Sequence, residues 1–569
     1  MTTRHRKRRI ARTLGCAIAA LSTLCASAVA SETPKPGGVL EIATLYRTLP
    51  TLSWDPADWG WKTNHDTGQM FEQLFAADLT KAKRLGGPHA FYADAWLPSD
   101  AIRGELAERW EWKQNPLRLE VTLRDGVRFP EKPGVMAARD LVADDVVYAY
   151  NRLLQSPKKT AGYYDYLEKV QATGPKTVVF TFKKFNSEWD YRFGYGYYSG
   201  IYPKEVVEAG ITDWKKLNGT GPFMLTDFVQ GNAATYTRNP DYWGSATIGG
   251  QTVKLPLLDK VVFRNIRDLS TANTALRQGK IDMLESVRWS DVEPLKKSAP
   301  QLQWARWLSM SGQFLAMRMD TKPFDDVRVR RALNMAVNKQ EIIDAYYGGQ
   351  AELFSHPQHP DYTGYYEPLD KMPDSVRELY VYDPARAKKL LAEAGYPNGF
   401  SFKVQVCACN PDHMELLPLV AAYLEQVGVR LDIQPMEYGS FLATILAKTH
   451  APGLFSSTPH SNPTTTLRTN FLPGQQANTA IYRDPDFDRR LAEAYGEQDE
   501  PKRQAMIKAL TREIVDKAPY IWLPTPYVFT AWWPWVKNYG GELRAGANRP
   551  GPIYARIWID QEMKKKMGY

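Results

Sequence analysis

Cysteine is scarce in this sequence. The 569 residues contain four cysteines, and two of them, Cys16 and Cys25, fall within the first thirty residues. If that segment is removed on export, Cys407 and Cys409 alone remain. Two cysteines cannot build a multi-disulfide framework, and a chain this long has enough apolar residues to form large cores.

Long apolar runs and a basic surface are also lacking. After residue 30 the chain has no stretch of about eighteen consecutive apolar residues, so we expect that it does not span a membrane. Its net charge is +9, but residues 1–30 carry six Lys or Arg and no acid, which leaves the remainder at +3. A charge this small over so long a chain excludes the basic surface typical of nucleic-acid binding.

Catalytic motifs are missing as well. The sequence contains no G-x-S-x-G nucleophile elbow, no H-E-x-x-H zinc motif and no G-x-x-x-x-G-K-[ST] phosphate loop. We therefore predict a binding protein with no catalytic residue, no cofactor and no metal. A secreted hydrolase on an unusual fold is the weaker alternative.

Two short clusters offer metal-binding side chains. Cys407, Cys409 and His413 lie within seven residues after an expected strand, and His356 and His359 flank a proline-rich loop. Thiolates and imidazoles suit zinc or copper. The first cluster has a simpler explanation. Its cysteines would be small, partly buried residues at a strand end that are oxidised or joined to each other.

The first thirty residues have the pattern of a secretory signal. A basic segment precedes an apolar stretch from Leu14 to Cys25, and Ala28-Val29-Ala30 follows as a cleavage site. We predict export to the periplasm, with a membrane anchor as the weaker alternative.

Strand and helix patterns alternate along the rest of the chain. Residues 108–129 predict a hairpin, 138–154 a helix and 176–182 a strand. Residues 327–349 predict one long helix that begins after an Asp pair and ends at Gly-Gly. This alternation favours α/β lobes.

Five segments of the chain form a recognisable series. In order, they are LAERWEW with LEVTLRDGVRF, ARDLVADDVVYAYNRL, NGTGPFMLTDF with YTRNPDYWG, PFDDVRVRRALNMAVNKQEII, and DPARAKKLLAEAGYPNGF. Together they resemble the family-5 extracellular solute-binding proteins, the dipeptide- and oligopeptide-binding group. Asn338-Lys339 replaces the usual Asp-Arg of the fourth segment. The resemblance covers nearly all of the chain after the leader.

The resemblance implies an α/β, two-lobed periplasmic-binding-protein clamshell with an extra subdomain on the first lobe. The implied ranges are 1–30 for the signal peptide; 31–80, 219–305 and 525–569 for the first lobe; 81–218 for the extra subdomain; and 306–524 for the second lobe. It also implies capture of a small solute, a peptide by family default, and delivery to the permease subunits of an ABC importer. We expect a monomer.

Ligand contacts are expected from irregular segments that face the cleft. The chain is rich in aromatic residues, which suits a cleft lined with rings, although each ring can equally belong to a core. The predicted ligand-binding residues are Trp54, Trp59, Trp61, Cys409, Asn410, Phe455, Ser456, Ser457, His460, Asn462, Trp522 and Tyr527.

One segment departs from the family pattern. Peptide binders carry an aspartate there that pairs with the ligand's α-amine, whereas residues 438–483 of this chain contain no Asp or Glu. A buried ammonium without a carboxylate is costly. Either another acid replaces it, or the solute is a polyol, a sugar conjugate or an anion rather than a free-amine peptide. A chaperone or signal receptor on the same fold is a further alternative.

Overall fold

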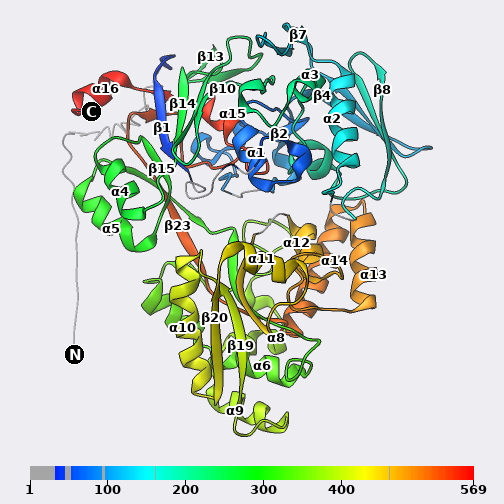
Figure 1. The fold of residues 1–569 in the computed structure, drawn as a ribbon, viewed down its shortest axis with the longest axis vertical. Coiled ribbons are helices and arrows are strands. Elements are labelled where there is room, and N and C mark those ends of the chain that lie inside the picture. The colour runs from blue at the N-terminus through cyan, green and yellow to red at the C-terminus, as the bar shows by residue number, and fades with distance from the viewer. Residues whose placement is uncertain (1–32, 45–50, 52, 93–95, 160–161, 460–461) are drawn as a thin grey trace, which may run out of the picture.

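The computed structural model describes residues 33–44, 51, 53–92, 96–159, 162–459 and 462–569. The predicted signal peptide and His460 lie outside these residues. Two large sheets organise the molecule into two lobes, one above the other in Figure 1.

The first-lobe sheet is assembled from segments far apart in the chain. Its strand order is β10-β11-β14-β1-β15-β23-β16, and β18 pairs with β23. Strand β1 runs parallel to β14 and β15, while β23 is antiparallel to β15 and β16. The bounds are β1 Val39–Ala43, β10 Phe223–Val229, β11 Ala233–Arg238, β14 Lys260–Arg264, β15 Met283–Val287, β16 Gln303–Leu308, β18 Ala351–Glu352 and β23 Thr525–Trp532.

Helices and short hairpins surround this sheet. The helices are α1 Trp61–Thr67, α4 Leu269–Arg277, α5 Trp289–Ser298, α15 Gly551–Tyr554 and α16 Gln561–Lys566. The paired short strands are β2 Phe75–Ala77 with β3 Ile102–Gly104, β12 Ser245–Ile248 with β13 Gln251–Lys254, and β24 Val536–Lys537 with β25 Trp558–Ile559.

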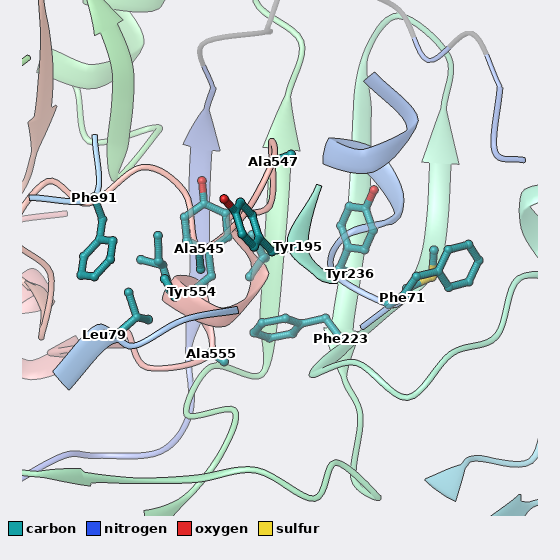
Figure 2. Packing of buried hydrophobic residues seen from close by; sticks show 14 of the residues in the cluster. Phe71, Leu79, Phe91, Tyr195, Phe223, Tyr236, Ala545, Ala547, Tyr554 and Ala555 are labelled. Atoms are coloured by element: carbon teal, nitrogen blue, oxygen red, sulfur yellow. The ribbon is translucent and has the colours of Figure 1, made fainter. Parts of the chain in front are cut away.

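The extra subdomain continues the first lobe. Its sheet has the order β4-β5-β9-β8, and its strands and helices are β4 Ala107–Lys113, β5 Arg118–Leu123, β6 Arg128–Phe129, β7 Arg139–Asp140, β8 Leu167–Gly174, β9 Thr177–Phe182, α2 Ala143–Gln155 and α3 Lys204–Ala209. One continuous apolar core serves the subdomain and the first lobe. Figure 2 shows part of it, where Phe71, Tyr195, Tyr236 and Tyr554 come from distant segments.

The second lobe has its own sheet and core. The strand order is β20-β19-β21-β17-β22, with β19 parallel to β20 and β21. Its strands are β17 Ser311–Met317, β19 Phe400–Cys407, β20 Val429–Met436, β21 Gly453–Pro459 and β22 Tyr520–Trp522. Its helices are α6 Val327–Ala336, α7 Lys339–Glu341, α8 Asp374–Arg377, α9 Pro384–Glu393, α10 Pro411–Glu425, α11 Tyr438–Leu446, α12 Pro463–Phe471, α13 Pro485–Gly496 and α14 Glu500–Asp516.

The predicted helix over 327–349 is wrong as a single element. It begins as expected, because Asp326 accepts a hydrogen bond from the Arg328 backbone N–H, but α6 ends at Ala336. The buried Lys339 ammonium donates to the Asn334 carbonyl at 2.6 Å, which is the acceptor that the Asn338 N–H would need in a continuous helix. The Asn338 side chain instead caps α7, and a π-helical turn follows.

Two short connections join the two sheets, one from β16 to β17 and the other from β22 to β23, and they lie side by side between the lobes. The short strand β18 also reaches from the second-lobe segment to pair with β23. Such paired connections concentrate any relative motion of the lobes into a few residues.

Candidate functional site

A cavity, called here the central cavity, opens between the two lobes beside these connections. Arg288 and Trp289 line it from the first lobe, at the end of β15 and the start of α5. Gln313 on β17 and Ser457 on β21 line it from the second lobe, and Tyr527 on β23 lines it beside the passage between the sheets. The other lining residues are Arg267, Leu269, Ser286, Val287, Ser309, Ser311, Asn410, Pro411, Asp412, His413, Pro526 and Val528.

The start of α10 is shaped by a cap. Asn410 accepts a hydrogen bond from the His413 backbone N–H at 3.3 Å, and Pro411 occupies the first helical position. Strand β19 ends just before this cap, where a disulfide joins Cys407 to Cys409. The first turn of α10 is therefore fixed at the cavity wall.

Several buried polar atoms of the cavity wall have no hydrogen-bond partner among the described residues. They are the Gln313 side-chain oxygen, both ring nitrogens of His413 and the Nε of Arg288. Leaving such an atom unsatisfied costs about 1–3 kcal/mol. A solute with amide or hydroxyl groups would satisfy these atoms.

His413 is held as a neutral ring. Burial lowers its pKa to about 4, and its ring packs edge-on against Phe455 with centroids 5.3 Å apart. A neutral imidazole donates one hydrogen bond and accepts another. His413 can therefore bind an uncharged polar group at neutral pH.

Two of the three charged residues described in the cavity wall are paired with each other. Arg288 lies within 3.2 Å of Asp412 and also bonds Glu415 and the Tyr346 hydroxyl. Because Arg288 belongs to the first lobe and its partners to the second, these contacts hold the lobes together. The third charged residue, Arg267, is exposed, and the rest of the lining is neutral, polar and aromatic.

Replacing His413 with leucine is expected to flatten the acid dependence of stability. The pKa of His413 in the folded protein lies below its unfolded value of 6.5, so its contribution is complete above pH 6.5 and is lost as pH falls. Between pH 6.5 and pH 5 the wild type should lose about 2 kcal/mol more than His413→Leu. Urea unfolding at both pH values measures this difference, and parallel losses would contradict it.

The extra subdomain makes a second contact between the lobes. Glu188, whose side chain is 5% exposed, bonds Arg192 and accepts hydrogen bonds from Thr464 at 2.9 Å and from Thr465 on α12. The Ser187 backbone N–H also donates to the Tyr495 carbonyl on α13 at 2.8 Å. Burial raises the pKa of Glu188, but the charges of Arg192 and Arg468 outweigh burial and hold it below its ordinary value.

The structure brings three of the predicted ligand-binding residues to the central cavity, namely Asn410, Ser457 and Tyr527. Their contact with solute stays a prediction. Cys409 and Ser456 neighbour the lining residues in sequence, and Cys409 is taken up in the disulfide.

The other predicted residues that the structure describes do not line this cavity, and their role in ligand binding also stays a prediction. Trp54 packs against Phe228, and Trp59 lies against Tyr163, Tyr164 and Tyr198. Trp61 begins α1 and is 38% exposed. Phe455 and Trp522 belong to the second-lobe core, and Asn462 caps α12.

The structure leaves no free thiolate for the alternative of a metal site at Cys407 and Cys409. Cys407 and Cys409 are joined to each other, and the described residues contain no group of three or more candidate metal ligands. Burial lowers the pKa of His356 to about 3 and that of His359 to about 4, and His356 stacks on Trp522.

Sequence reasoning missed most of the residues that line the cavity, including four that bear on solute binding. Arg288, Trp289 and Gln313 lie in or beside ordinary strands and carry no local signal. His413 was considered only as a metal ligand, although its place after a strand end was the argument used for Asn410.

A two-lobed α/β fold with a polar cavity at the lobe interface defines a solute-binding protein of the periplasmic type. Within the described residues, we find no helix long and apolar enough to cross a bilayer. The chain belongs to the bacterial extracellular solute-binding proteins, family 5, since the model of that family's middle region matches residues 101–479. This confirms the predicted family and the prediction of a binding protein rather than an enzyme.

Two curated relatives are similar over most of their length. "Heme-binding protein A" of Haemophilus influenzae is 28% identical over 78% of this chain and 82% of its own. The "Dipeptide-binding protein" of Escherichia coli is 26% identical over 76% of this chain and 83% of its own. The structure of the Helicobacter pylori periplasmic binding protein DppA, solved with the peptide STSA, superposes with a TM-score of 0.73 at 24% identity, covering 92% of this chain and 99% of that one. This similarity confirms the predicted clamshell fold.

Proposed function

We propose that this protein is the periplasmic capture component of an ABC import system and that it binds a peptide or peptide-like solute. The observation that carries the proposal is the set of unsatisfied, uncharged hydrogen-bonding groups on Gln313 and His413 beside the rings of Trp289 and Tyr527. Peptide amides would supply both donors and acceptors to these groups. The names of the relatives, which include di- and tripeptide-binding proteins, support the same solute class.

Capture would proceed by closure of the lobes. We assign the first lobe to residues 31–80, 219–305 and 525–569, the extra subdomain to 81–218 and the second lobe to 306–524, with the connections between the sheets as the hinge. A solute that touches both lobes binds the closed form better and stabilises it. The closed form would then be recognised by permease subunits. We expect the exported chain to act as a monomer.

A non-peptide solute is the second candidate. It is favoured by the absence of any acid in residues 438–483 and by the pairing of Asp412 with Arg288, since Asp412 is the one carboxylate among the described residues of the cavity wall. A free α-amine would have to compete with a guanidinium for that carboxylate. A polyol or a sugar conjugate without an ammonium group does not need that carboxylate.

Native mass spectrometry of the protein purified from its source compartment tests these proposals. A one-chain complex that releases short peptides supports the first candidate, and a single non-peptide compound supports the second. A protein that carries no solute and shows no thermal shift with peptides or sugars would contradict the capture role. The same spectrum reports the oligomeric state.

A further inference from the structure

A second cavity lies between the extra subdomain and the second lobe. Arg468 lines it from α12, and Tyr166 lines it from the segment before β8. We call it the Arg468 cavity. The subdomain (cyan) and helices α12 to α14 (orange) approach each other in this part of Figure 1.

Arg468 is a buried cation whose hydrogen-bonding groups are largely unused. The residue is 6% exposed, and none of its three nitrogens makes a hydrogen bond of good geometry among the described residues, although the Tyr495 hydroxyl lies close enough to interact with the guanidinium. Burying a guanidinium in this way is expensive unless an acceptor satisfies it. The site therefore has the donors for an anion.

The charges around Arg468 also favour binding of an anion. Glu188 is the buried carboxylate of this cluster, and it is already bonded by Arg192, Thr464 and Thr465. Two guanidiniums thus share one carboxylate. Both lie over the ring of Tyr163, at 3.8 Å for Arg192 and 4.2 Å for Arg468. Cation–π contacts of this kind stabilise a buried guanidinium but provide no hydrogen-bond acceptor.

Tyr166 offers a further donor on the opposite wall. Its hydroxyl is buried and has no hydrogen-bond partner among the described residues. Burial raises the pKa of this hydroxyl well above its ordinary value, although the charges of Arg192 and Arg468 oppose the shift, so the proton is retained. The exposed residues Asp165 and Lys184 lie at the rim and balance each other's charge.

We propose that the Arg468 cavity binds an oxyanion, a carboxylate or a phosphate group, between the Arg468 guanidinium and the Tyr166 hydroxyl. Since one donor belongs to the second lobe and the other to the subdomain, the complete site exists only when these parts are in contact. An anion bound there stabilises the closed form by the same population shift as a solute in the central cavity. The proposal does not depend on which solute the central cavity takes.

Titration of the purified protein with sodium phosphate and with sodium acetate tests the site, with sodium chloride at matched ionic strength as the reference. We expect a saturable rise in Tm with at least one oxyanion. Arg468→Met should weaken that binding at least 100-fold. Tyr166→Phe should weaken it about 10-fold, since hydrogen bonds to charged groups are worth about 1.5–3 kcal/mol. Tyr166→Phe also decides the question if Arg468→Met does not fold.

Arg489→Met is the matched control, because Arg489 is an exposed arginine on the neighbouring helix α13. It should bind the oxyanion as the wild type does. Binding of phosphate with acetate inert assigns a phosphoryl group, and binding of acetate assigns a carboxylate. An equal Tm rise with chloride, or unchanged binding in both Arg468→Met and Tyr166→Phe, would overturn the proposal.

Discussion

Replacing Ser457 with tryptophan is expected to raise the Kd for the captured solute by about 100-fold to 1000-fold. Ser457 lies on β21 opposite Gln313 of β17 and lines the central cavity. An indole at this position would occupy the space beside Gln313 and His413, so the solute would lose about 3–4 kcal/mol of contacts. Isothermal titration with the solute identified by mass spectrometry measures the change.

The control for this variant is Ser457→Ala, which removes one hydroxyl without filling the cavity. Its Kd should stay within about 10-fold of the wild type, because one neutral hydrogen bond contributes about 0.5–1.5 kcal/mol. Unfolding by urea should show that both variants are folded. Wild-type affinity in Ser457→Trp would mean that the solute binds elsewhere.

The second large effect on the apparent Kd for solute is expected from Glu188→Gln. This change leaves Arg192 and Arg468 buried without a carboxylate where the subdomain contacts α12. Breaking a buried pair in this way costs about 3–5 kcal/mol. Because the buried cluster forms between the lobes, the cost falls on the closed form, and the apparent Kd for solute should rise by at least 100-fold.

Glu493→Gln is the matched control for Glu188→Gln. Glu493 pairs with Arg489 on the surface of α13, where both side chains are more than half exposed. Surface pairs of this kind are worth about 0–1 kcal/mol, so solute affinity should not change measurably. Equal effects of the two substitutions would show that the subdomain contact does not contribute to closure.

Local signals predicted much of the fold. The hairpin of β4 and β5 and the helix α2 follow from periodicity and turn residues that lie within each segment. In the same way, Asp383 caps α9, with Pro384 at the first helical position. The helix over 327–349 was mispredicted because a tertiary contact of Lys339, with the carbonyls of Asn334 and Leu379, intervenes in its middle.

The candidate site was predictable only in part, because it too depends on contacts between distant segments of the chain. Asn410 was predicted because it follows an expected strand, and Ser457 because it lies in the segment that departs from the family pattern. Gln313 and Arg288 could not be found, because nothing within ten residues of either distinguishes it from an ordinary strand or strand-end residue. Their place at the cavity depends on pairings such as β17 with β21 and β15 with β23, which join residues more than a hundred positions apart.

The sequence by itself determined the α/β character of the chain, the family and the binding role, since each depends on patterns that are complete within short segments. Only the tertiary structure decided which polar groups meet at the lobe interface and which of them remain without a partner. Burial and hydrogen bonding depend on what the rest of the chain places around a side chain. For Gln313, His413 and Arg468 those neighbours come from both lobes.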